Sequence, residues 1–473
     1  MSVQNLTYEQ MMAKKNEIMR TAVGIDYDKY NTGKIAFDYE GMMKDTGFSL
    51  EDIAKIQAET AVGNTPLVEL KNITKLVRAV SAKGKGARIF VKDEAANPSG
   101  SFKDRRASIS AYQAKKKGYP GIAAATSGNY GAAVASQAAK LGLKSIIVQE
   151  MFDSRGVEQP EIAEKTRTCE ARGAEVVRLS VGPELFSTFL KVLVETGFFN
   201  ASLYTPYSIL GIETLGYEIA TEMKKKEGKF PDVVVATNAG GGNVTGTGRG
   251  LLKAGAKDTV LIGASVDLSG LHMASDNDFN RKSFTTGHTG FARPFTTQPD
   301  RSDVPRNAAR PLRYIDRFVT ITQGEVFYMT QLLAELEGME RGPAGNTSLA
   351  AAFALARTMD QDKIIVVQET EYTGAGKHPI AQLNLAKEMG IEVRRGNPKD
   401  NKPGKAIVIP EHPKQIEIID VDMDDLRKSY LKNNIVKYAD NETISDIDIE
   451  FLAQDTKLSK DKVKKMIEEL RKK

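Results

Sequence analysis

The chain has very few of the residues that build disulfide frameworks or metal centres. Its 473 residues include one cysteine, Cys169, four histidines and no tryptophan. A single cysteine excludes an intramolecular disulfide, and the histidines have none of the spacing typical of zinc ligands. Cys169 lies where a helix pattern runs into a strand pattern. We therefore expect a buried structural thiol there and no metal site.

Long apolar runs and blocks of one charge are also missing. The first 20 residues lack the apolar core of a signal peptide, and no apolar run approaches the length of a membrane span. The formal net charge is only +5, with basic residues scattered among acidic ones. A basic stripe for nucleic acid is therefore not expected. These features predict a cytoplasmic protein that binds neither membranes nor nucleic acids.

Three regions differ in their sequence pattern. Residues 1–58 are polar and helical, with Ser49 as a helix cap. Between residues 59 and 396, short β-rich runs alternate with helix-patterned stretches. This predicts an α/β fold whose mainly parallel sheets are buried on both faces and flanked by helices, with a smaller nested domain at about 107–212. Residues 397–473 read as a linker rich in proline, glycine and charge, then a helical tail capped at Ser459. The tail is expected to pack on the core or a second subunit rather than bind DNA.

The stretch "NPSGSFKDRRA" places Lys103 where a strand hands over to a helix. The preceding "ARIFVKDEA" has the composition of a strand, and the following residues favour a helix that ends near Gly118. A lone lysine at a helix start is usually just solvated. Its significance depends on three other stretches that also follow predicted strands.

The first of these is "TSGNYG", which follows the predicted strand 121–125. Backbone N–H groups at a helix start bind carboxylates, and Ser127 and Asn129 add side-chain hydrogen bonds. A simple helix cap is the alternative.

The second is "AGGGNVTGTG", which follows the predicted strand 233–237. Consecutive glycines are conformationally costly, so an exposed backbone that cradles a phosphate is favoured over an ordinary loop. The stretch matches neither a P-loop nor a dinucleotide fingerprint.

The third is "KIIVVQETEYTGAGKHP", whose strand ends in a cluster of polar groups. Thr373 is the expected ligand-facing hydroxyl, because open α/β sheets bind ligands at the carboxyl ends of their strands. Glu369, Thr370 and Glu371 compete for that position. A lysine, a carboxylate turn, a phosphate turn and a polar strand end together predict pyridoxal 5′-phosphate (PLP), which forms a Schiff base with lysine.

Residues 60–390 resemble fold type II PLP enzymes, the tryptophan synthase β-like group, through "NPSGSFKDR", "TSGNYG" and "AGGGNVTGTG" in that order. The resemblance implies a two-domain fold. It also implies that Lys103 forms the Schiff base, that Phe102 lies beside the ring, and that Thr373 faces the pyridine nitrogen, although the preceding "QETE" departs from the family pattern. The resemblance further implies that the substrate carboxylate contacts Thr126, Ser127, Gly128 and Asn129. It implies that the phenolic oxygen of the cofactor contacts Asn129, and that the cofactor phosphate contacts Gly240, Gly241, Gly242 and Asn243.

Within this group, "SFKDR" and "TGAGKHP" are similar to threonine synthases. The whole chain, leader and tail included, is similar to the β subunits of thiolases that use coenzyme A to split 2-amino-4-oxopentanoate into acetyl-CoA and alanine in ornithine degradation. That resemblance implies an amino-acid substrate, coenzyme A, a small α subunit, and a homodimer or α/β hetero-oligomer. Two alternatives remain open: a threonine synthase-like elimination or replacement on a phosphorylated amino acid, and a non-catalytic binding module.

Coenzyme A is strongly anionic, and one arginine-rich segment is a candidate to bind it. "PDRSDVPRNAARPLRYIDRF" contains Arg301, Arg306, Arg310, Arg313 and Arg317. Arginine favours charge-assisted bonds to phosphates. The alternative is a salt-bridged surface loop.

Overall fold

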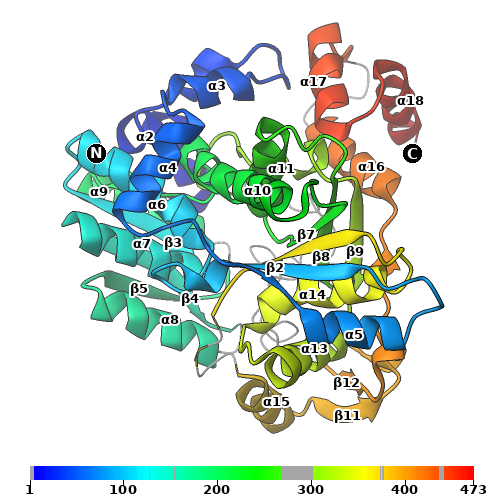
Figure 1. Ribbon diagram of the computed structural model, residues 1–473. Helices are drawn as coiled ribbons and strands as arrows, with labels where there is room; N and C mark the ends of the chain where they lie inside the picture. Colours follow the sequence, from blue (N-terminus) through cyan, green and yellow to red (C-terminus); the bar gives the residue numbers. More distant parts are fainter. Residues whose placement is uncertain are drawn as a thin grey trace.

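The computed structural model describes residues 5–126, 128–153, 156–182, 184–268, 302–372, 374, 378–435 and 442–472. Within these ranges the larger sheet has parallel central strands and an antiparallel strand at each edge. Figure 1 shows this sheet beside a smaller one. In spatial order the strands of the larger sheet are β1 (Leu67–Glu69), β2 (Arg88–Asp93), β10 (Ile364–Glu369), β7 (Val233–Thr237), β8 (Val260–Val266), β9 (Arg317–Ile321) and β13 (Ile419–Asp420).

Strand β7 shows how the larger sheet is buried on both faces. Val234 and Ala236 pack in one hydrophobic cluster with helices α10 (Pro206–Glu227) and α11 (Gly242–Lys253). Val233 and Val235 pack in a second cluster with α5 (Lys71–Ala79), α13 (Gln323–Glu337) and α14 (Pro343–Ala356). Figure 1 shows the two sets of helices on opposite sides of the sheet. The predicted parallel, doubly covered sheet is confirmed.

The smaller sheet is formed by a continuous part of the chain. All its pairings are parallel, in the order β5 (Glu175–Ser180), β4 (Lys144–Phe152), β3 (Gly121–Thr126) and β6 (Phe199–Asn200). Its surrounding helices are α6 (Lys103–Lys116), α7 (Asn129–Leu141), α8 (Pro160–Ala171) and α9 (Glu184–Thr196). Cys169 on α8 is fully buried, as expected.

The segment after residue 396 is not the plain linker that its composition suggests. Strand β12 (Ala406–Pro410) pairs in parallel with β11 (Glu392–Gly396), and the short helix η7 (Pro398–Asp400) lies between them. Ile407 is buried against Phe327 of α13. The five residues "AIVIP" supply enough apolar surface to dock on α13, and the flanking proline, glycine and charge conceal that signal.

Segments near the two ends of the chain contact each other, although Figure 1 marks the N- and C-terminal ends on opposite sides of the view. Asp448 accepts hydrogen bonds from the backbone N–H groups of Ile35 and Ala36, both at 2.8 Å. Ser49 and Ser459 cap their helices, as predicted. The terminal helices are α1 (Tyr8–Ala13), α2 (Lys15–Ala22), α3 (Tyr39–Asp45), α4 (Leu50–Glu59), α16 (Met423–Ile435), α17 (Asp446–Thr456) and α18 (Lys460–Arg471). The other helices are η2 (Tyr27–Tyr30), η3 (Glu94–Ala96), η5 (Pro311–Arg313), α15 (Pro379–Glu388) and η8 (Pro413–Gln415).

None of the helices in the described ranges is long and apolar enough to cross a membrane.

Candidate active site

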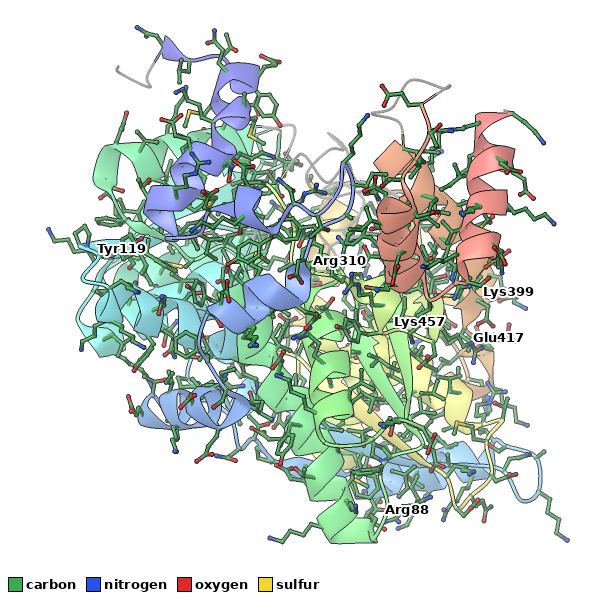
Figure 2. The ribbon with its side chains drawn as sticks, turned by 90° about the horizontal axis from the view of Figure 1, so that it is seen from above. Arg88, Tyr119, Arg310, Lys399, Glu417 and Lys457 are labelled. Atoms are coloured by element: carbon green, nitrogen blue, oxygen red, sulfur yellow. The ribbon has the colours of Figure 1, made fainter. Side chains whose placement is uncertain are left out.

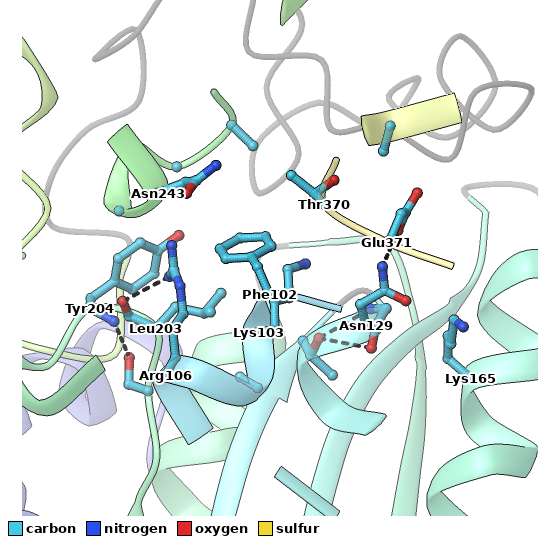
Figure 3. A pocket seen from close by; sticks show the side chains of 18 of the residues that line it. Phe102, Lys103, Arg106, Asn129, Lys165, Leu203, Tyr204, Asn243, Thr370 and Glu371 are labelled. Atoms are coloured by element: carbon cyan, nitrogen blue, oxygen red, sulfur yellow. Dashed lines mark hydrogen bonds between the residues drawn. The ribbon is translucent and has the colours of Figure 1, made fainter. Parts of the chain in front are cut away.

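A pocket lies between the two sheets, at the carboxyl ends of β3, β7 and β10 (Figure 3). The carboxyl ends of parallel strands are where open α/β sheets bind ligands. Here the structure brings together three predicted parts of the site. They are Lys103, the turn at Thr126, Gly128 and Asn129 predicted to bind a carboxylate (the carboxylate turn), and the turn Gly240–Gly242 predicted to bind a phosphate (the glycine turn). The predicted residues that line the pocket are Phe102, Lys103, Thr126, Gly128, Asn129, Gly240, Gly241, Gly242 and Asn243. Ser127 and Thr373 lie outside the described residues.

Lys103 is the first residue of α6, and its neighbours fix the start of that helix. The carboxylate of Asp104 accepts from the backbone N–H of Ser99 at 2.6 Å and from Gln137 at 3.1 Å. The backbone N–H of Phe102 donates to the carbonyl of Thr370 at 3.0 Å. The lysine is thus positioned by both sheets.

Arg105, on the same helix, forms buried ion pairs that hold the helix start in place. Its guanidinium contacts Glu94 at 2.7 Å and Glu218 at 2.8 Å. Burial opposes its charge, but the attraction of the two carboxylates raises the pKa of Arg105 above its ordinary value. Removing either carboxylate would leave charge uncompensated in the interior.

The glycine turn 240–242 leads directly into helix α11. Gly241 is the N-cap with a left-handed φ of +82°, and a Cβ there would lie 2.5 Å from Pro311. Asn243 donates to the carbonyl of Thr237 at 3.2 Å, which ties the turn to the end of β7. The backbone N–H groups at this helix start form a surface suited to a phosphate.

The carboxylate turn 126–129 leads into α7. The hydroxyl of Thr126 accepts from the backbone N–H of Gly128 at 3.1 Å. The amide of Asn129 donates to the carboxylate of Glu371 across the pocket, and Figure 3 marks this bond.

The structure separates the residues that compete to meet the pyridine nitrogen. Thr370 and Glu371 line the pocket, whereas Glu369 does not. Glu369 is fully buried against Gly345. Burial and the neighbouring Glu371 raise its pKa well above its ordinary value. Glu369 therefore lies inside the protein rather than on the pocket wall, where Thr370 and Glu371 lie.

Further polar residues line the pocket and were not found from the sequence, among them Arg106, Glu150, Tyr204 and Asp303. Burial raises the pKa of Glu150 to about 8. Burial also raises the pKa of Asp303, although it accepts hydrogen bonds from Asn200 and Ser202, both at 2.8 Å. The only sequence signal for any of these residues is the doubled arginine after "FKD".

The arginine segment expected to bind coenzyme A is instead engaged within the chain. Arg310 and Arg313 pair with the buried Asp455 of α17, and Figure 2 shows Arg310 near the terminal helices. Arg317 pairs with Asp420 at 2.7 Å. The remaining member in the described ranges, Arg306, bonds to the carbonyl of residue 35 at 3.1 Å.

These four side chains therefore hold the terminal segments and the sheet edge together, which agrees with the salt-bridged alternative for this segment rather than with the coenzyme A hypothesis. Arg301 lies outside the described residues.

The residues of the pocket fit PLP. Lys103 lines the pocket wall, where an ε-amine can meet an aldehyde, and α11 offers glycine-lined N–H groups for a phosphate. The buried guanidinium of Arg106 has no carboxylate partner in the described part of the chain, so this end of the pocket calls for an anion.

Comparison with known proteins agrees with this fit. The chain belongs to the pyridoxal-phosphate-dependent enzyme family, whose model matches residues 58–371. It is 64% identical to a 2-amino-4-ketopentanoate thiolase β subunit from an unknown prokaryotic organism, over 98% of both chains. It is 62% identical to the protein of the same name from Acetoanaerobium sticklandii, over 99% of both chains. The crystal structure of cysteine synthase from Entamoeba histolytica matches with a TM-score of 0.51 and 22% identity, over 66% of this chain and 86% of that one, and shows the shared fold.

Proposed function

We propose that this chain is the PLP-binding β subunit of a thiolase that cleaves 2-amino-4-oxopentanoate with coenzyme A to acetyl-CoA and alanine. The observation that carries the proposal is the pocket in which Lys103 meets the carboxylate turn and the glycine turn. Full-length similarity to two relatives that are named thiolase β subunits supports the choice of substrate.

The walls of the pocket divide the work of binding. Phe102 is assigned to the cofactor ring, and the role at the pyridine nitrogen is assigned to Thr373. Backbone N–H groups at the starts of α7 and α11 bind anions. The substrate carboxylate is assigned to Thr126, Ser127 and Gly128, the phenolic oxygen to Asn129, and the phosphate to Gly240, Gly241, Gly242 and Asn243.

Lys103 carries the chemistry. Its ε-amine would hold the aldehyde carbon of PLP, and in the presence of the substrate it would move a proton at Cα. The coenzyme A sulfur attacks C4, the C3–C4 bond breaks, and C3 keeps the electron pair and takes up a proton. PLP, when bound, supplies a conjugated electron-withdrawing group at C2 that stabilises the charge on C3.

A small second subunit completes the proposed enzyme. The two relatives are named β subunits, which supports an α partner for this chain as well. The assembly is a homodimer or an α/β hetero-oligomer, and coenzyme A binds in the complete enzyme.

The test begins with covalent capture. The PLP-loaded chain is reduced with borohydride and digested, and we expect a pyridoxyl group on the peptide that contains Lys103 and none in Lys103→Ala. The chain is then mixed with 2-amino-4-oxopentanoate and coenzyme A, with and without the α subunit. Acetyl-CoA formation supports the proposal. Turnover of O-phosphohomoserine without any thiol, in place of acetyl-CoA formation, would overturn it in favour of a lyase.

A further inference from the structure

Two consecutive arginines on α6 have opposite surroundings. Both are buried, with Arg105 fully covered and Arg106 5% exposed. Arg105 contacts two carboxylates, Glu94 and Glu218. Arg106 makes one hydrogen bond at 3.4 Å to the carbonyl of Leu203, and its Nε has no partner in the described part of the chain. A guanidinium has five N–H donors, so Arg106 retains unused donors inside the protein.

The charge of Arg106 is also uncompensated. Its electrostatic neighbours are the phenols of Tyr130 and Tyr204, whose own pKa values burial raises. Burial lowers the pKa of Arg106 only to about 10, so the side chain remains a cation at neutral pH. A buried cation without an anionic partner is strongly unfavourable, and such a group marks a place where an anion binds.

The guanidinium lies at the glycine turn. A Cβ placed on Gly242 would lie 2.7 Å from Arg106 Nη2, and one placed on Gly240 would lie 3.4 Å from the hydroxyl of Tyr204. Figure 3 shows Arg106 and Tyr204 beneath Asn243, at the end of the pocket opposite Asn129. The start of α11 and an unpartnered arginine therefore converge on one place. Helix N–H groups and arginine both favour phosphate.

We propose that Arg106 binds the phosphate group of PLP and acts with the backbone of the glycine turn as a charged clamp. The inference rests on the cofactor placement proposed above. The ligand chemistry is a phosphate monoester dianion, to which arginine donates two parallel hydrogen bonds. Because Lys103 lies one helical turn before Arg106, the same helix would hold the two ends of the cofactor.

The test compares two cofactors that differ only in the phosphate. Dissociation constants of PLP and of pyridoxal are measured by absorbance titration of the cofactor-free full-length chain, for the unaltered protein, Arg106→Met and Arg106→Lys. Arg178→Met is the matched control, because Arg178 is half-exposed and pairs with Glu170. We expect Arg106→Met to weaken PLP about 10- to 100-fold and pyridoxal less than about threefold, the loss typical of one charged hydrogen-bonding group. Arg106→Lys should recover part of the difference.

Each other outcome decides the question. Equal weakening of PLP and pyridoxal would make Arg106 a structural residue and overturn the proposal. A loss of coenzyme A affinity with unchanged PLP affinity would assign the anion to coenzyme A and also overturn it. If Arg106→Met does not fold by circular dichroism, the ratio of PLP to pyridoxal affinity in Arg106→Lys decides, and an unchanged ratio overturns the proposal. The ³¹P resonance of bound PLP should shift in the variant and not in the control.

The failure of the thiolase proposal is distinguishable from this one. Suppose that the unaltered chain discriminates PLP from pyridoxal through Arg106 but forms no acetyl-CoA with the α subunit. That result would support the role of Arg106 in phosphate binding and refute the proposed thiolase reaction.

Discussion

Asn129, the first residue of α7, donates a hydrogen bond to Glu371, which follows β10 of the other sheet. The bond spans the pocket and joins the carboxylate turn to the strand end that carries Thr370. A second link lies nearby, where the backbone N–H of Tyr372 donates to the carbonyl of Gly100 at 2.7 Å. The Asn129–Glu371 bond therefore joins the two sides of the pocket at this end, and the Tyr372–Gly100 bond ties together the chain segments that follow β10 and β2.

The Asn129–Glu371 bond predicts a charge-dependent change in stability. Asn129→Asp removes the donor and sets two carboxylates against each other, so we expect the free energy of unfolding of the cofactor-free chain to fall by about 2 kcal/mol. The double variant Asn129→Asp/Glu371→Gln restores a donor and an acceptor in reversed order. It should recover at least half of the loss in a urea titration. A double variant that is as unstable as the sum of the single ones would refute the proposed link.

The glycine turn predicts different effects at adjacent positions. Gly241→Ala places a side chain at φ +82° and 2.5 Å from Pro311, and should cost roughly 2 kcal/mol of stability. Gly240→Ala is the matched control. Its nearest neighbours are atoms of the Tyr204 side chain, the hydroxyl at 3.4 Å and a ring carbon at 3.5 Å, and the change should stay within about 0.5 kcal/mol. Thermal unfolding of the cofactor-free variants measures both, and equal effects would contradict the geometry of the turn.

Glu150 predicts a pH-dependent gain in stability on substitution. Burial raises its pKa from 4.5 to about 8, so the folded chain retains a proton that the unfolded chain releases. The folded state therefore loses stability as the pH rises from about 4.5 to about 8. Glu150→Gln stays neutral and should be more stable than the unaltered chain by a few kcal/mol at pH 9, with a much smaller difference at pH 5.

Thermal midpoints at the two pH values check this expectation. The control is Glu184→Gln. The charge of Glu184 acts on Glu150, but Glu184 is exposed, so this variant should show no such trend. A gain for Glu150→Gln of the same size at pH 5 and pH 9 would show that the carboxyl is not protonated by burial.

Asp455 predicts that the C-terminal helices are part of the stable fold. Asp455→Asn leaves the buried Arg310 without its carboxylate and Arg313 with only Glu40 at 4.0 Å, and should cost about 3–5 kcal/mol. Asp446→Asn, at an exposed position that pairs with Lys464, should cost less than about 0.5 kcal/mol. Limited proteolysis should release the C-terminal helices α17 and α18 from the Asp455→Asn chain much faster than from the control. Equal cutting rates would show that the tail is held by other contacts.

Much of the pocket could be read from the sequence because its parts are local. A β-rich run, a polar or glycine-rich turn and a helix pattern follow each other at Lys103, Thr126 and Gly240. Parallel strands place such turns at one edge of a sheet, so three local patterns imply one site.

The rest of the pocket depends on tertiary contacts that no local pattern records. Arg105 and Arg106 are neighbours of the same type, and only the fold shows that one meets two carboxylates and the other none. The high pKa of Glu150 is likewise a consequence of burial. The sequence could not name the ion-pair partner of Arg310, because Asp455 lies 145 residues away.

The order of the strands has a consequence for synthesis on the ribosome. The smaller sheet uses residues 121–200, so it can form as soon as that part of the chain emerges. Strand β2 cannot complete its pairing at that stage. Its partner is β10, in which Ile364 lies opposite Arg88, and β10 is synthesised much later. Until then Ile89, Phe90 and Val91 have only the three-residue β1 beside them. A nascent chain halted before β10 therefore presents an apolar strand edge, and protection of that edge by chaperones governs how much of the enzyme reaches its folded state.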